Sequence, residues 1–126
     1  MLLTKIIYLI IGGSLGTVAR YFISNATYQL FGSGFPYGTL TVNLLGCFIM
    51  GLLAALSDYK LLLGPSARLL LMIGFCGAFT TFSTLIFETN NLIKDGQDLR
   101  ALANIMVSVI AGFIIFRIGI FLGRIL

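Results

Sequence analysis

Four long stretches without a charged residue dominate this sequence: 6–19, 21–57, 69–87 and 101–116. A helix of about 20 apolar residues crosses the hydrocarbon core of a bilayer, and a charge inside that core is costly. The turn-forming residues Gly32 to Pro36 divide the second stretch. The sequence therefore predicts an all-α membrane protein with a single transmembrane domain over 1–126, whose spans cover about 4–30, 37–57, 67–93 and 99–124.

The composition excludes most other classes of protein. Only 10% of the residues are charged and 59% are hydrophobic, whereas about a quarter of a typical soluble domain is charged. Four spans leave no room for a separate catalytic module, and the absence of histidine removes the usual general base and zinc ligand. We therefore expect a chain that is not an enzyme, contacts the lipid bilayer, and binds no nucleic acid.

The third span has an unusual middle. Between Gly74 and Thr84 it mixes glycines, hydroxyl side chains and β-branched residues, which weaken a helix. We expect an interrupted helix there. Broken membrane helices expose carbonyl oxygens, which can coordinate a hard cation such as Na⁺.

Three polar side chains lie deep in the apolar stretches. Arg20 is expected to line a wet vestibule or to form a pair, or else to snorkel toward the interface. Asn43 can bond a neighbouring helix or bind an anion. Glu88, near the end of the third span, is either functional or a snorkelling carboxylate.

The fourth span carries a seam of small and polar residues on one face, formed by Asn104, Ser108, Gly112 and Gly119. Arg117 is expected near a helix end. Four thin helices cannot easily enclose a solvated pathway, so we expect a homodimer. One predicted face carries four lysines and arginines and the other carries two, so the chain inserts either in one orientation by a small margin or in both orientations.

Three motifs together resemble the Fluc (CrcB) family of bacterial fluoride channels. They are Gly12-Gly13-Ser14-Leu15-Gly16 with Arg20-Tyr21, then Gly38-Thr39-Leu40-Thr41-Val42-Asn43-Leu44-Leu45-Gly46, and then the stretch from Gly74 through Gly77-Ala78-Phe79-Thr80-Thr81-Phe82-Ser83-Thr84. The resemblance implies a dual-topology, antiparallel homodimer in the bacterial inner membrane. It also implies passive export of cytoplasmic fluoride through two pores, each built from both subunits.

The resemblance also assigns roles to residues of this chain. Main-chain carbonyls of Gly77 and Thr80 from both subunits would hold a structural Na⁺ at the dimer interface, and Arg20 would line an anion-attracting vestibule. The pore would be formed by Asn43, Phe82, Ser83, Thr84 and Ser108. Further candidates for the pathway are Thr39, Glu88, Asn104 and Leu85.

Leu85 departs from the family pattern, which has a second phenylalanine after Phe-Ser-Thr. An aliphatic side chain lacks the electropositive ring edge of phenylalanine. We therefore hypothesise a working channel with altered throughput or anion affinity, or a heterodimer whose partner supplies the missing ring.

Two other functions fit a chain of this length. A small multidrug-type exporter is also a four-span antiparallel dimer, but it needs an acid deep in its first span, and no acid occurs between Met1 and Ser57. A non-transporting membrane subunit would use the glycines and polar residues only for helix packing. Reconstituted flux of fluoride, chloride and drugs separates the three.

Overall fold

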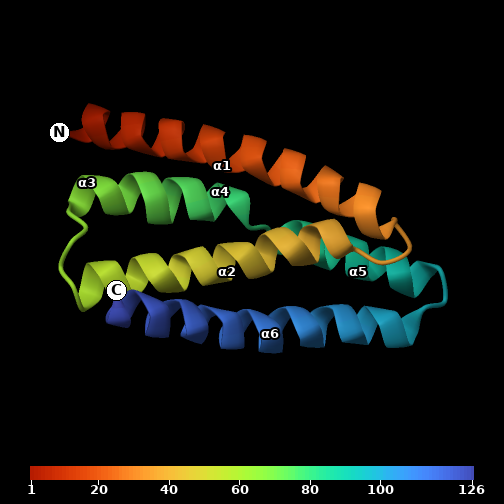
Figure 1. The fold of residues 1–126 in the computed structure, drawn as a ribbon. Coiled ribbons are helices and arrows are strands. Elements are labelled where there is room, and N and C mark those ends of the chain that lie inside the picture. Colours follow the sequence, from red (N-terminus) through yellow and green to blue (C-terminus); the bar gives the residue numbers. More distant parts are fainter.

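The computed structural model describes residues 1–126 as an all-helical bundle in which consecutive spans run antiparallel (Figure 1). The first span is α1 (Leu2–Phe31), the second α2 (Tyr37–Asp58) and the fourth α6 (Asp98–Ile125). The third span consists of α3 (Pro65–Ala67), η1 (Arg68–Cys76), α4 (Gly77–Phe79) and α5 (Phe82–Lys94). All four spans are long and apolar enough to cross a membrane, which confirms that part of the expected fold.

Short loops connect the spans and place both termini at one end of the bundle, beside the α2–α3 loop (Figure 1). Gly32 ends α1 with a φ of 82°, a left-handed conformation that glycine adopts without strain. Pro65 lies in the first turn of α3, where its missing N–H has no helical partner to lose. We call the end with the termini the terminal end, and the other end the loop end.

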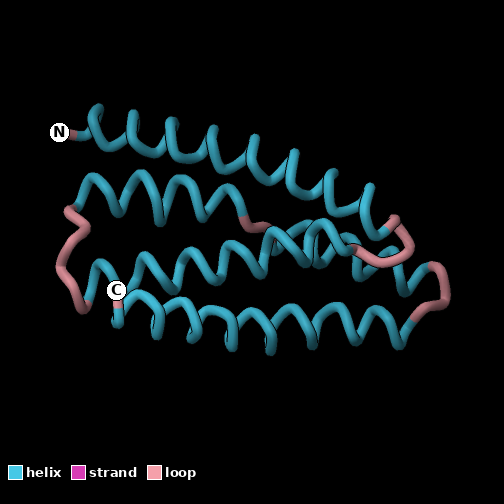
Figure 2. The backbone as a smooth tube through the Cα atoms, viewed as in Figure 1, coloured by secondary structure: helices cyan, strands magenta, loops and turns pink.

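The third span is interrupted near its middle, as the sequence predicts. Thr80 (φ −91°, ψ 158°) and Thr81 (φ −150°, ψ 116°) are extended, and a new helix begins at Phe82. Figure 2 shows this interruption as a short pink segment in the middle of the bundle. The half that precedes it includes nine residues of π-helix in η1, a wide-turn conformation that is rare and that the sequence did not predict.

Glycines allow the helices to approach closely. A Cβ at Gly12 or Gly16 would overlap the backbone carbonyls of Leu70 and Phe75, so α1 lies directly against η1. Gly51 in α2 and Gly119 in α6 form a similar contact. Small residues of this kind hold helices together in lipid, where no hydrophobic driving force between helices operates.

Most large apolar side chains point outward. Only 22 of the 126 residues are buried, and many large apolar side chains of the first, third and fourth spans are exposed. Such a surface requires an apolar surrounding. The chain is therefore a multi-pass membrane protein.

Candidate functional site

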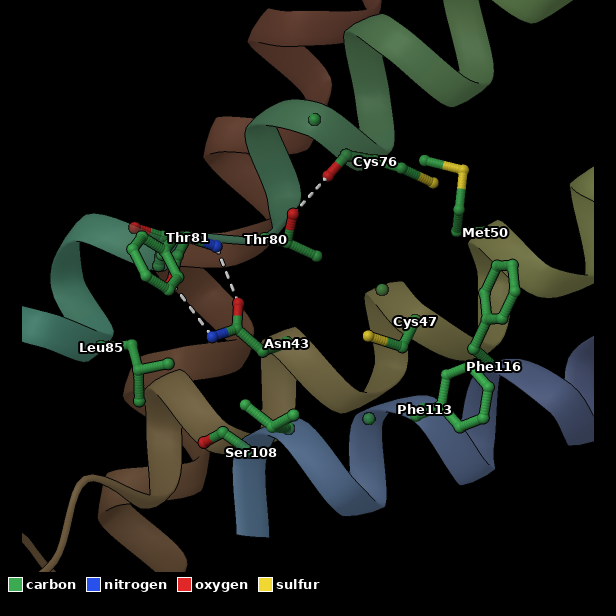
Figure 3. A pocket seen from close by; sticks show the side chains of 15 residues that line it. Asn43, Cys47, Met50, Cys76, Thr80, Thr81, Leu85, Ser108, Phe113 and Phe116 are labelled. Carbon is green, nitrogen blue, oxygen red and sulfur yellow. Dashed lines mark hydrogen bonds between the residues drawn. The ribbon is translucent and has the colours of Figure 1, made fainter. Parts of the chain in front are cut away.

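The interruption is held by one amide side chain. Asn43 Nδ2 donates a hydrogen bond to the Thr81 carbonyl over 3.0 Å, and the Thr81 N–H donates to Asn43 Oδ1 over 2.7 Å. Both bonds are drawn in Figure 3. Because the interruption removes the helical partners of Thr81, the Asn43 amide replaces them and satisfies both backbone groups. We call this pair the Asn43–Thr81 clamp.

Threonine side chains cap the two helix ends that meet there. Thr80 Oγ1 donates to the Cys76 carbonyl over 2.9 Å, at the end of α4. Thr81 Oγ1 accepts from the Thr84 N–H over 3.2 Å and donates to Thr84 Oγ1 over 3.0 Å. Threonine at this position is a favourable N-cap, so the sequence begins α5 at Phe82.

The same bonds release two carbonyl oxygens. In a regular α-helix the Thr81 N–H would donate to the Gly77 carbonyl and the Thr84 N–H to the Thr80 carbonyl. Here these two N–H groups donate to Asn43 Oδ1 and Thr81 Oγ1. A Cβ on Gly77 would meet no atom within 4 Å, so this residue borders open space. Unbonded carbonyl oxygens suit a hard cation, so Gly77 and Thr80 have the type of oxygen ligand that the expected Na⁺ site requires.

An apolar cavity of about 530 Å³ lies on one side of the clamp, between α2, the third span and α6 (Figure 3). Asn43, Phe82 and Ser108, three of the expected pore residues, line it. The Ser108 hydroxyl is buried and has no hydrogen-bond partner. The remaining lining residues are Gly46, Cys47, Met50, Cys76, Gly77, Thr80, Thr81, Leu85, Val109, Gly112, Phe113 and Phe116.

Positions 82 and 85 differ sharply in exposure. The Phe82 residue is 74% exposed, whereas Leu85, where the family pattern has its second phenylalanine, is 5% exposed. Leu85 lies one helical turn after Phe82 in the packed part of α5. The aromatic edge that the cavity does contain from α5 therefore comes from Phe82 alone.

A polar cavity of about 250 Å³ lies on the other side of the clamp. Arg20, Thr39, Thr84 and Glu88, four of the expected site residues, line it together with Thr17, Tyr21, Ser24, Asn25, Val42 and Thr81. Arg20 forms no salt bridge, since the single salt bridge of the chain joins Arg68 to Asp58. Glu88 lines the same cavity but forms no salt bridge with Arg20, so the half-buried guanidinium is free to interact with an anion that enters.

Glu88 is held at the edge of the polar cavity by two hydroxyl groups. Thr39 Oγ1 donates to one carboxylate oxygen over 2.5 Å and Tyr28 Oη to the other over 3.2 Å. Glu88 also lines a third cavity of about 350 Å³ that lies toward the loop end. Sequence reasoning missed Tyr28, because its spacing from Glu88 along the chain carries no sign of the contact.

Two expected residues lie outside both cavities. Asn104 is 1% exposed and donates from Nδ2 to Thr89 Oγ1 over 2.9 Å, and Thr89 in turn donates to the Leu85 carbonyl over 2.7 Å. Asn104 therefore joins α6 to α5 within the bundle. Ser83 is exposed at the start of α5, with its Oγ 3.4 Å from Thr81 Oγ1.

These features define a class of protein: a small, multi-pass membrane protein whose interrupted helix lies between two cavities, as in proteins that move ions. The sequence model of the family described as CrcB-like protein, Camphor Resistance (CrcB), matches residues 7–120. The chain belongs to this family.

Curated relatives carry a more specific name. The chain is 45% identical over 120 residues to a "Fluoride-specific ion channel FluC" from Citrifermentans bemidjiense, covering 95% of this chain and 97% of the relative. Proteins of the same name from Solidesulfovibrio magneticus and Dehalococcoides mccartyi are each 43% identical, covering 99% and 97% of this chain and 100% and 94% of their own lengths. Ion channels are not enzymes, so the expectation that this chain is not an enzyme is confirmed.

Proposed function

We propose that this chain is a passive fluoride channel of the bacterial inner membrane, assembled as an antiparallel homodimer with two pores. Membership of the CrcB family and the fluoride-specific channels among its relatives support the ion. The single observation that carries the site assignment is the Asn43–Thr81 clamp, which separates a polar cavity with an arginine from an apolar cavity with a ring and a hydroxyl.

The lining groups suit a small, tightly hydrated anion. Arg20 draws anions into the polar cavity, and hydroxyl groups such as that of Thr84 replace part of the lost hydration. In the apolar cavity the free hydroxyl of Ser108 and the ring edge of Phe82 offer weak positive charge without a fixed cation. An anion is therefore attracted into the polar cavity but is not bound tightly in the apolar cavity.

A second copy of the chain supplies the missing wall in this proposal. Phe82 lines the apolar cavity yet is largely exposed in the single chain. An ion pathway cannot border lipid, because hydrocarbon does not solvate an anion. An inverted second copy covers this side and completes each pore with residues of both subunits.

The released carbonyls of Gly77 and Thr80 are the proposed ligands of a structural Na⁺ at the interface of the two copies. A Na⁺ held there would neutralise the partial negative charge at the C-terminal end of α4 in each copy. The protein provides the oxygens by ending α4 at Phe79 and diverting the N–H groups of Thr81 and Thr84.

Flux measured on purified protein in liposomes tests the proposal. Fluoride should leave loaded liposomes rapidly. Chloride should leave them no faster than it leaves liposomes without protein. A proton gradient should not drive accumulation of a cationic drug. Drug transport would favour the exporter, and the absence of any flux would favour a non-transporting subunit. Fluoride flux that requires a second, different chain would replace the homodimer with a heterodimer.

A further inference from the structure

The helix α6 carries a row of exposed residues that faces away from the rest of the chain. The row consists of Ile110, Ile114, Arg117, Phe121 and Arg124, at alternating spacings of four and three that keep one helix face. Its apolar members are between 51% and 62% exposed. Gly112, Gly119 and Gly123 occupy other faces and are buried, and a Cβ at the last two would overlap α2.

The row is separate from the proposed pore. Arg117 lines none of the three cavities. The neighbouring side of α6, with Phe113 and Phe116, faces the apolar cavity instead (Figure 3). Arg117 can therefore interact only with groups that lie outside the bundle.

The two arginines of the row lie at different depths below the terminal end. Arg124 is next to the last residue of α6, and its Cζ lies 4.6 Å from the centre of the Tyr59 ring. Arg117 precedes it by seven residues, or about 10 Å along the helix axis. Since each headgroup layer is only about 5–7 Å thick, Arg117 lies at the boundary of the hydrocarbon when Arg124 lies among the headgroups. Arg117 therefore lies about two turns before the end of α6, deeper than the sequence-based expectation of a position near a helix end.

Arg117 has no acidic partner within the chain, because the one salt bridge joins Arg68 to Asp58. An unpaired guanidinium at the edge of the hydrocarbon is unfavourable unless it extends to water or to an anionic group at the interface. The row contains two positive charges and no carboxylate, so a row of the same kind on a second copy would repel it. The complementary partner is an anionic group that is joined to apolar chains.

We propose that this row binds an anionic glycerophospholipid at the terminal end of the bundle. Arg117 and Arg124 hold the phosphate between them, and the acyl chains lie along Phe121, Ile114 and Ile110 toward the middle of the membrane. Tyr59 supports Arg124 from the α2–α3 loop through its ring face. The site belongs to each chain and does not depend on the proposed fluoride transport.

Native mass spectrometry of the detergent-purified protein, titrated with dioleoylphosphatidylglycerol or dioleoylphosphatidylcholine, tests the proposal. The wild type should retain the anionic lipid preferentially. Arg117→Gln and Arg124→Gln should each weaken that binding about fivefold, the expected effect of removing one arginine near anionic lipid. Arg117→Lys should keep most of it. Arg100→Gln is the matched control, since Arg100 is an exposed arginine near the opposite end of the same helix.

The proposal is overturned by equal retention of the two lipids, or by unchanged phosphatidylglycerol binding in the Arg117→Gln, Arg124→Gln double variant. It is also overturned if Arg117→Gln dissociates the oligomer and leaves lipid retention unchanged, since the row then contacts another copy. Size-exclusion profiles and unfolding temperatures of all variants identify any that fail to fold. In that case the Arg117→Lys and Arg124→Gln variants decide the outcome.

Discussion

The two cavities on either side of Thr81 share this residue but differ in nearly every other property. The larger, apolar cavity is lined mainly by sulfur-containing, aromatic and aliphatic side chains, whereas the smaller one is lined mainly by hydroxyls, one amide and two charged residues. Both are built on the same interruption of the third span. The clamp from Asn43 is thus a partition between two chemical environments as well as a replacement for lost helical bonds.

The difference divides the proposed pathway into two tasks. Attraction of an anion needs a positive charge with access to water, which Arg20 offers in the polar cavity. Release of the anion needs groups that replace its hydration without holding it tightly, which Phe82 and Ser108 offer in the apolar cavity. Changes on the two sides should therefore alter flux in different ways.

Removal of the partition should have the largest effect. Asn43→Ala leaves the N–H and carbonyl of Thr81 unsatisfied, at a cost of about 1–3 kcal/mol for each group. Without the clamp, Thr81 and the lining groups around it lose their fixed positions, and we expect fluoride efflux from liposomes to fall about 100-fold, the size of effect that a misplacement of about 1 Å can have at a functional site. An ion-selective electrode measures this rate, and size-exclusion chromatography should show the oligomer intact.

The matched control for this change is Asn104→Ala, which also removes a buried amide but at a position that lines neither cavity. It should lower the unfolding temperature by several degrees, because Thr89 loses a bond and a small cavity forms. Efflux should stay close to that of the wild type. Equal losses of flux in the two variants would mean that Asn43 acts only through stability.

Loss of the aromatic ring should have the next largest effect. Phe82→Ile keeps an apolar side chain but removes the electropositive ring edge from the apolar cavity. We expect efflux to fall about tenfold, at the upper end of what an aromatic contact contributes. Phe87→Ile serves as the control, because Phe87 is also largely exposed on α5 but lines no cavity. Equal effects at the two positions would remove Phe82 from the site.

A change on the polar side should act through electrostatics. Arg20→Gln should reduce efflux about threefold at low ionic strength and less at high ionic strength, since salt screens the attraction of a charge in contact with water. Arg20→Lys should keep most of the rate. Rates of the variants at two salt concentrations test this, and a loss of flux that ignores salt would contradict the vestibule role.

The smallest change is expected at the position that departs from the family pattern. Leu85→Phe adds a second ring edge beside the apolar cavity, which should raise efflux about twofold. Because Leu85 is almost fully buried, the larger side chain also strains the packing of α5. Ordinary wild-type rates that stay the same in Leu85→Phe would refute the hypothesis of altered throughput.

The sequence predicted those features that depend on one segment at a time. Uncharged stretches identified the four spans, and the glycines and hydroxyls between Gly74 and Thr84 located the interruption. It did not predict that η1 would be a π-helix, because no residue pattern distinguishes wide turns from α-helical ones. The expected pore and Na⁺-site residues were chosen from the family resemblance rather than from periodicity.

Contacts between spans were beyond single-sequence reasoning. The pairing of Asn43 with the backbone of Thr81, and of Glu88 with Tyr28 and Thr39, joins residues that lie 38 or more positions apart. A polar residue in an apolar span signals that a partner exists, but not which one. Asn104 illustrates the limit: it lies on the expected polar seam, yet its partner is Thr89 in the bundle interior.

The glycine contact between α1 and η1 has a consequence for how this chain tolerates mutation. No residue of α1 lines the apolar cavity, and much of that helix faces outward, where one aliphatic side chain can replace another. At Gly12 and Gly16, however, a single methyl group would overlap the carbonyls of η1 and wedge the two spans apart. The displaced segment leads directly into Gly77 and Thr80, which line the apolar cavity. The width of that cavity therefore depends in part on two glycines of α1, a helix that does not line it.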